Sequence, residues 1–199
     1  MKVISGIYKG RNIEGFNMPG TRPTMDRVKE SLFAMIQDNI KDSTILDLFS
    51  GSGSLAIEAL SQGAKEAYAV DKSYQATKVI NTNIKNISVK NCKVLTSDYK
   101  VALKTFSTQN IKFDLIFLDP PYDTDYIEKS LKLIAEFNLT KDNGLIICES
   151  NSIDKIVYPS EFKQIKEKKY GDKWVVILEK ICQNISRINS NGDANEKKK

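Results

Sequence analysis

The sequence predicts an α/β fold built on a mostly parallel sheet of seven strands. Five short apolar runs alternate with segments of helical periodicity, at residues 45–48, 67–70, 92–95, 115–118 and 145–148. Strands that alternate with helices in this way indicate a parallel sheet covered on both faces. Two further strands, 162–170 and 174–178, flank a Gly-Asp turn and predict an antiparallel hairpin that closes one edge.

Helical spacing of apolar residues predicts helices over 55–60, 74–87 and 127–137, between the strands. The same spacing predicts a helix over 25–40, with Thr24 as its N-cap. Residues 2–13 have glycines at their bends and predict a small β-hairpin ahead of this helix.

Composition excludes several classes of protein. The 199 residues are 41% hydrophobic and hold no run long enough to span a membrane, so we expect a soluble, cytoplasmic protein. There is no histidine, which excludes Ser-His-Asp and Cys-His catalysis. The cysteines Cys92, Cys148 and Cys182 form no metal-binding pattern, so we expect no metal. The net charge of +5 permits a polyanionic partner but does not require one.

A glycine-rich turn follows the first predicted strand of the sheet. Gly51, Gly53 and Ala56 fit the pattern G-x-G-x-x-A, which lets a ligand approach the backbone at a helix N-terminus. Asp71 ends the next strand, 20 residues after Gly51, where an acid can bind both hydroxyls of a ribose. The turn predicts a nucleoside cofactor, either a nicotinamide dinucleotide or S-adenosylmethionine.

Two other aspartates bear on this choice. Asp47, in the strand before the turn, could stabilise the turn amides or bind the ammonium group of S-adenosylmethionine. A carboxylate there would repel the pyrophosphate of a dinucleotide. Asp98, after the third strand, could accept a hydrogen bond from the adenine amino group, or it could cap the next helix.

The segment Asp119-Pro120-Pro121-Tyr122, after the fourth strand, is the most specific signal in the chain. The amino group of an aromatic base is a poor nucleophile because its lone pair is delocalised. The Asp119 carboxylate and the Pro120 carbonyl can accept its two N–H groups and favour the charge that develops on nitrogen. Tyr122 can stack on the base. We therefore predict Asp119, Pro120 and Tyr122 as the catalytic residues.

These two motifs resemble those of the amino-methyltransferases that use S-adenosylmethionine. The chain is more specifically similar, over residues 2–180, to the bacterial 16S rRNA guanine-N2 methyltransferases. Other parts of the resemblance are Gly10-Arg11, Thr21-Arg22-Pro23-Thr24, Glu58-Ala59-Leu60 and Tyr170-Gly171-Asp172. The resemblance implies a Rossmann-like class I fold and methyl transfer to a guanine amine in 16S rRNA or the assembling small subunit.

The resemblance also implies that Thr21, Arg22 and Pro23 lie over the cofactor and the target base. With the residues above, this predicts a cofactor site of eight residues: Asp47, Phe49, Gly51, Gly53, Asp71, Asp98, Thr21 and Arg22. The chain departs from the family at three positions, with Gln62 for Arg, Asp71 for Glu and Lys2 for Arg. The Gln62 exchange would weaken a surface RNA contact.

Basic residues near the N-terminus fit binding to RNA phosphates. They are Lys2, Lys9, Arg11, Arg22, Arg27 and Lys29. We accordingly divide the chain into an RNA-facing segment (1–24), a monomeric methyltransferase domain (25–182) and a disordered tail (183–199). The target base would have to be flipped out of the RNA.

Three alternatives stay open. The Asp-Pro-Pro-Tyr segment also suits a DNA adenine-N6 or cytosine-N4 methyltransferase, although the chain lacks a sizeable target-recognition region. A nicotinamide-dependent oxidoreductase would use the same glycine turn, but it has no use for two adjacent prolines. A cofactor-binding scaffold would bind RNA without forming a methylated product.

Overall fold

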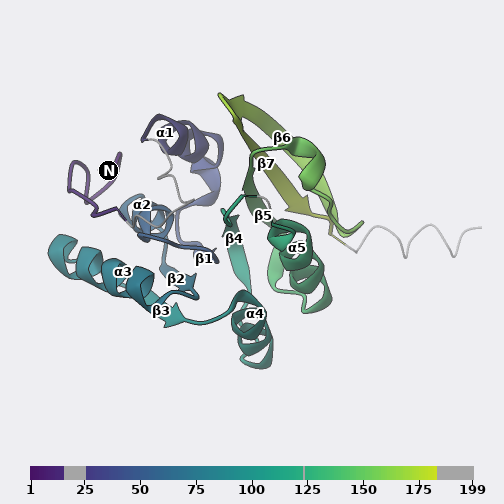
Figure 1. Ribbon diagram of the computed structural model, residues 1–199, viewed down its shortest axis with the longest axis horizontal. Helices are drawn as coiled ribbons and strands as arrows, with labels where there is room; N and C mark the ends of the chain where they lie inside the picture. The colour runs from purple at the N-terminus through teal and green to yellow at the C-terminus, as the bar shows by residue number, and fades with distance from the viewer. Residues whose placement is uncertain (16–25, 123, 183–199) are drawn as a thin grey trace, which may run out of the picture.

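The structure is a computed structural model, and it describes residues 1–15, 26–122 and 124–182. A seven-stranded sheet runs through its centre in the order β3-β2-β1-β4-β5-β7-β6 (Figure 1). The strands are β1 (Thr44–Asp47), β2 (Glu66–Asp71), β3 (Cys92–Thr96), β4 (Phe113–Leu118), β5 (Thr140–Ser150), β6 (Phe162–Tyr170) and β7 (Lys173–Lys180). β1 to β5 are parallel, whereas β7 is antiparallel to both β5 and β6. The predicted fold class is confirmed.

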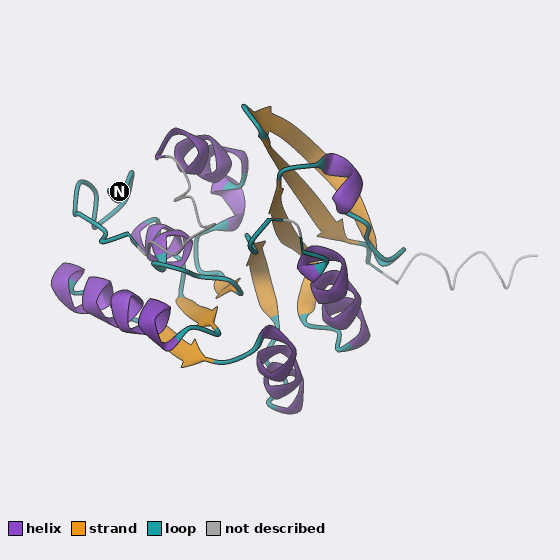
Figure 2. Ribbon diagram, in the orientation of Figure 1, coloured by secondary structure: helices purple, strands orange, loops and turns teal. Residues whose placement is uncertain are grey.

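Helices cover both faces of this sheet (Figure 2). They are α1 (Asp26–Met35), α2 (Ser54–Ser61), α3 (Tyr74–Ile87), α4 (Tyr99–Thr108) and α5 (Tyr126–Glu136), with short 3-10 turns at η1 (Gln37–Asn39) and η2 (Ile153–Lys155). α1, α2 and α3 lie on one face, and α4 and α5 lie on the other.

The apolar runs are continuous because both faces of the strands are buried. Ile45 of β1 packs in the core beneath α1, α2 and α3, while its neighbour Leu46 packs in the core beneath α4 and α5. Successive strand side chains point to opposite faces, so one run supplies both cores.

The N-terminal segment forms a loop closed by a single antiparallel bridge, between Lys2 and Asn12, rather than a hairpin of two regular strands. Several of its backbone amides donate to α2 (Ser54–Ser61) instead of to the loop itself. Those of Ile4 and Ser5 donate to the Glu58 carboxylate of α2, at 2.8 and 2.9 Å. The amide of Ile7 donates to the Ser61 carbonyl at 2.8 Å. The segment is therefore attached to α2, and the division of the chain at residue 24 stays a prediction.

The first helix is shorter than the predicted 25–40. It ends at Met35, because Ile36 has φ −116° and ψ 10° and leaves the helical conformation. The 3-10 turn that follows carries Ile40 into the core. Thr24, the predicted N-cap, lies outside the described residues, as does the predicted disordered tail.

No helix within the described ranges is long and apolar enough to cross a bilayer. The same ranges contain no group of three or more Cys, Asp or Glu side chains that could hold a metal ion. One of the two edge strands of the sheet, β6, carries the exposed lysines Lys163, Lys166, Lys168 and Lys169. Lysines on an edge strand disfavour pairing with a second sheet.

Candidate active site

The two predicted motifs begin at neighbouring strands. β1 pairs in parallel with β4, with Asp47 opposite Phe117, and the Leu48 amide donates to the Phe117 carbonyl at 3.2 Å. The glycine turn follows β1, and Asp119 follows β4. The strand order reverses between β1 and β4, which is the place where open α/β sheets bind ligands.

The glycine turn requires left-handed backbone at two positions. Gly51 has φ 53° and Gly53 has φ 77°, and Gly53 is the N-cap of α2. A Cβ on Gly53 would lie 3.0 Å from Cγ2 of Ile80, whereas a Cβ on Gly51 would meet nothing within 4 Å. A side chain at Gly53 would therefore crowd Ile80 of α3, whereas Gly51 faces open space in which a ligand can approach.

Asp71 holds the glycine turn to the loop after β2. Its Oδ2 accepts the Gly51 amide at 3.0 Å, and its Oδ1 accepts the Ser73 amide at 2.8 Å. A carboxylate oxygen has two lone pairs, so both oxygens keep capacity for a ribose hydroxyl. The carboxylate is thus fixed in place, and its ribose contact stays a prediction.

Asp47 is buried, with 1% of its surface exposed. Its Oδ2 accepts the Ala56 amide, in the first turn of α2, at 3.3 Å. Burial raises the pKa of Asp47 to about 7, against the lowering effect of the hydrogen bonds from Ala56 and Ser50. Of the two predicted roles, the amide contact is present, although with a helix amide rather than with the turn itself.

Three aromatic rings lie beside the glycine turn. Phe49 stacks on Tyr126 with ring centroids 5.9 Å apart, and it contacts Tyr99 at 5.7 Å. Asp98 caps α4, because its Oδ1 accepts the Lys100 amide at 2.9 Å. The capping alternative for Asp98 is thus observed, and its contact with adenine stays a prediction.

The Asp-Pro-Pro-Tyr segment lies directly after β4, with Pro120 buried and Asp119 and Tyr122 half-buried. The Tyr122 hydroxyl donates to Oε1 of Glu149 at 3.3 Å. Burial raises the pKa of the Tyr122 phenol above its ordinary value. Tyr122 is therefore held neutral and fixed at its hydroxyl end.

Sequence reasoning missed two charged residues next to this segment. Glu149 lies near the end of β5, and Lys173 is the first residue of β7. They form an ion pair in which the side chains are 6% and 12% exposed. Burial opposes the charge on Lys173, but the Glu149 and Asp119 carboxylates raise the pKa of Lys173 above its ordinary value. The sequence did offer a signal for Glu149, because this acid comes directly after the apolar run 145–148. No pattern in the sequence pointed to Lys173.

One predicted phosphate-binding residue is wrong. Lys29 is 0% exposed, and its Nζ lies 2.7 Å from the Lys2 carbonyl and 3.2 Å from Oε2 of Glu58. It sits in the apolar stripe of α1 with Leu32 and Phe33, and so it faces α2 rather than solvent. Gln62, expected at an RNA-contacting surface, donates to Oε1 of Glu58 at 2.8 Å.

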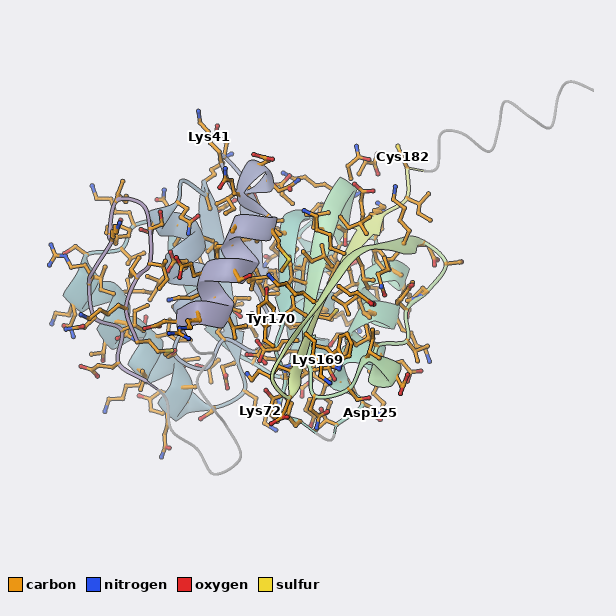
Figure 3. All side chains as sticks on the ribbon, turned by 90° about the horizontal axis from the view of Figure 1, so that it is seen from above. Lys41, Lys72, Asp125, Lys169, Tyr170 and Cys182 are labelled. Carbon is orange, nitrogen blue, oxygen red and sulfur yellow. The ribbon has the colours of Figure 1, made fainter. Side chains whose placement is uncertain are left out.

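The other predicted RNA-binding residues in the described ranges are exposed: Lys2, Lys9, Arg11 and Arg27. The neighbour of Lys9, Tyr8, bonds Ser61 at the end of α2 away from the glycine turn. Contact with RNA there would be remote from the site. Thr21, Arg22 and Pro23 lie outside the described residues. Figure 3 labels Lys72 and Asp125 at the lower margin of the molecule and Lys169 above them, and both of these lysines are exposed.

Comparisons with known proteins agree on a family. The family model described as "Conserved hypothetical protein 95" matches residues 1–179. The chain is 35% identical over 182 residues to the "Putative rRNA methyltransferase YlbH" of Bacillus subtilis, covering 90% of this chain and 99% of that protein. It is 34% identical over 173 residues to the ribosomal RNA small subunit methyltransferase D of Haemophilus influenzae, covering 86% and 89%.

Solved structures agree with this result. The structure described as "Putative methyltransferase yhhF from Escherichia coli" superimposes with a TM-score of 0.80 at 28% sequence identity. The match covers 92% of this chain and 99% of that one. Similarity therefore extends over the sheet, the helices and the N-terminal segment together.

Proposed function

The chain belongs to the family of the ribosomal RNA small subunit methyltransferases D, and from that membership we propose that it methylates the exocyclic N2 amine of a guanine in 16S rRNA. The methyl donor is S-adenosylmethionine. The carrying observation is that the glycine turn and the Asp-Pro-Pro-Tyr segment leave neighbouring strands at the same edge of the sheet.

The residues around the glycine turn fit the donor. Gly51 faces open space, and the Asp71 carboxylate is fixed beside it for a ribose. Asp47, buried and with a pKa of about 7, can ionise to balance an ammonium group. Phe49, half-buried and backed by the buried ring of Tyr99, offers apolar surface for adenine. When bound, the donor supplies a methyl group on a positively charged sulfur.

The residues after β4 fit the acceptor. Asp119 and the Pro120 carbonyl accept the two hydrogens of the guanine amine and direct its lone pair outward. This arrangement stabilises the positive charge that develops on nitrogen. Tyr122 stacks on the base and holds it in line, so the proximity of the reacting atoms adds to the rate. Water or Asp119 takes the proton that leaves the amine.

The family relatives and the exposed lysines support RNA as the substrate. Two relatives carry rRNA methyltransferase in their names. Lys72 follows Asp71 directly at the carboxyl end of β2, where its charge can attract phosphate. Backbone contacts of this kind position RNA, and Asp119 with Pro120 selects an amine-bearing base.

The test is transfer of tritiated methyl from S-adenosylmethionine to small-subunit RNA, with DNA of equal length as the comparison. Nucleoside mass spectrometry of the product should give N2-methylguanosine, and Asp119→Ala should abolish it. Methylated adenine or cytosine in DNA would instead establish the DNA methyltransferase alternative. Full turnover by Asp119→Ala would refute the assigned role of that residue.

A further inference from the structure

The ion pair of Glu149 and Lys173 lies where two strands meet the candidate active site. β5 and β7 are antiparallel here, with Glu149 opposite Val175 and Ser150 opposite Trp174. Both charged side chains are nearly buried. A buried ion pair contributes little net stability, because the loss of hydration offsets the attraction. Stability alone therefore gives little reason for a pair at this place.

The pair contacts Tyr122 at two points. Oε1 of Glu149, the oxygen that pairs with Lys173, also accepts the Tyr122 hydroxyl at 3.3 Å. Nζ of Lys173 lies over the Tyr122 ring, 5.5 Å from its centroid. The ion pair therefore holds the hydroxyl end of the ring and fixes the direction in which the ring points.

Lys173 is also within electrostatic reach of Asp119. The Asp119 carboxylate is among the groups whose charge favours the ammonium form of Lys173. The ion pair therefore lies beside the Asp-Pro-Pro-Tyr segment near both its first and its last residue.

We propose that Lys173 and Glu149 are positioning residues that clamp Tyr122 at its hydroxyl end, so that its ring keeps one orientation toward the target base beside Asp119. This inference rests on the proposed function. Both residues act through Tyr122 rather than on the reacting atoms. Misplacing the stacked base would slow methyl transfer while leaving the donor site intact.

The kinetic test uses variants that separate positioning from folding. Lys173→Met keeps the length of the side chain but leaves Glu149 unpaired, so Lys173→Met/Glu149→Gln removes both charges together. Lys173→Arg keeps the charge. The matched control is Lys163→Met, because Lys163 is an exposed lysine of the same hairpin that pairs with Glu179.

We expect the double variant and Lys173→Met to lower kcat by about 10- to 100-fold. KM for S-adenosylmethionine should stay within about twofold of the wild type, and Lys173→Arg should recover most of the rate. In a Tyr122→Ala background, Lys173→Met should lower kcat by no more than about a further twofold. A wild-type kcat in the double variant would overturn the proposal, and so would an undiminished effect of Lys173→Met without Tyr122.

A second measurement does not depend on methyl transfer. In protein labelled with 3-fluorotyrosine, the ¹⁹F resonance assigned through Tyr122→Phe should move in Lys173→Met and return toward its original position in Lys173→Arg. A Tyr122 resonance that has the wild-type position in both Lys173→Met and Lys173→Arg would refute the clamp. If the wild type methylates no RNA, the proposed function fails, and this measurement still decides whether the clamp exists.

Discussion

Replacing Asp47 by Asn tests the consequence of burying an acid without a counter-charge. Burial raises the pKa of Asp47 from 3.8 to about 7 in the folded chain. Between these values the folded state keeps a proton that the unfolded state has lost, so stability falls as pH rises from about 4 to about 7. Burial of Asp47 therefore costs no folding stability at low pH, and the cost is greatest above pH 7.

The magnitude follows from the shift. A gap of about 3 pH units at 1.36 kcal/mol per unit gives a cost of about 4 kcal/mol at pH 8 and about 2 kcal/mol at pH 5. Asp47 is buried, so no solvent discount applies. In Asp47→Asn the side chain at this position is uncharged at both pH 5 and pH 8. Its stability relative to the wild type should therefore rise by about 2–3 kcal/mol between pH 5 and pH 8.

Urea denaturation without cofactor, at pH 5 and pH 8, measures this difference. The control is Asp38→Asn, because Asp38 is exposed and reports only the effect of exchanging the side chain. A difference between Asp47→Asn and wild type that stays constant with pH would show that Asp47 is not protonated in the folded chain. The reasoning about its burial would then be wrong.

Three other predictions follow from described contacts. Affinity for S-adenosylhomocysteine should fall about tenfold from pH 8 to pH 6 as Asp47 takes up its proton, and calorimetry on Asp47→Asn should show no such change. Gly53→Ala should destabilise the fold by more than about 1–2 kcal/mol, because the strain of the left-handed backbone adds to the close contact with Ile80. Gly51→Ala should show the backbone strain alone, together with weaker cofactor binding, so equal melting temperatures for the two variants would contradict this reasoning. Lys29→Met should lower the free energy of unfolding by about 3–5 kcal/mol, because it leaves Glu58 as an uncompensated buried charge. A loss below about 1 kcal/mol in thermal or urea unfolding would mean that the amides of Ile4 and Ser5 are enough to stabilise the Glu58 carboxylate.

The sheet could be predicted from sequence because its strands are buried on both faces. Burial on both faces turns each strand into a short apolar run, and the run at 115–118 lies wholly within β4. The loops of the candidate site could be predicted for a related reason. Parallel strands end at a common edge, so residues after β1, β2 and β4 had to approach one another.

The contacts that failed to be predicted join residues far apart in the chain. Lys29 is a charged residue at a helical position, and local pattern alone expects it to reach solvent. Its partner Glu58 belongs to another helix, and only the packing of α1 on α2 brings them together. Lys173 likewise meets Glu149 across two antiparallel strands. Sequence periodicity describes which face of an element is apolar, but it does not identify buried charges with distant partners.

The attachment of the N-terminal loop to α2 sets an order on the assembly of the chain. The amides of Ser5 and Tyr8 bond side chains that lie 53 residues further along. Because the chain is synthesised from its N-terminus, Ser5 and Tyr8 are made before Glu58 and Ser61. These two amides therefore lack their native partners until the residues of α2 have been added to the chain.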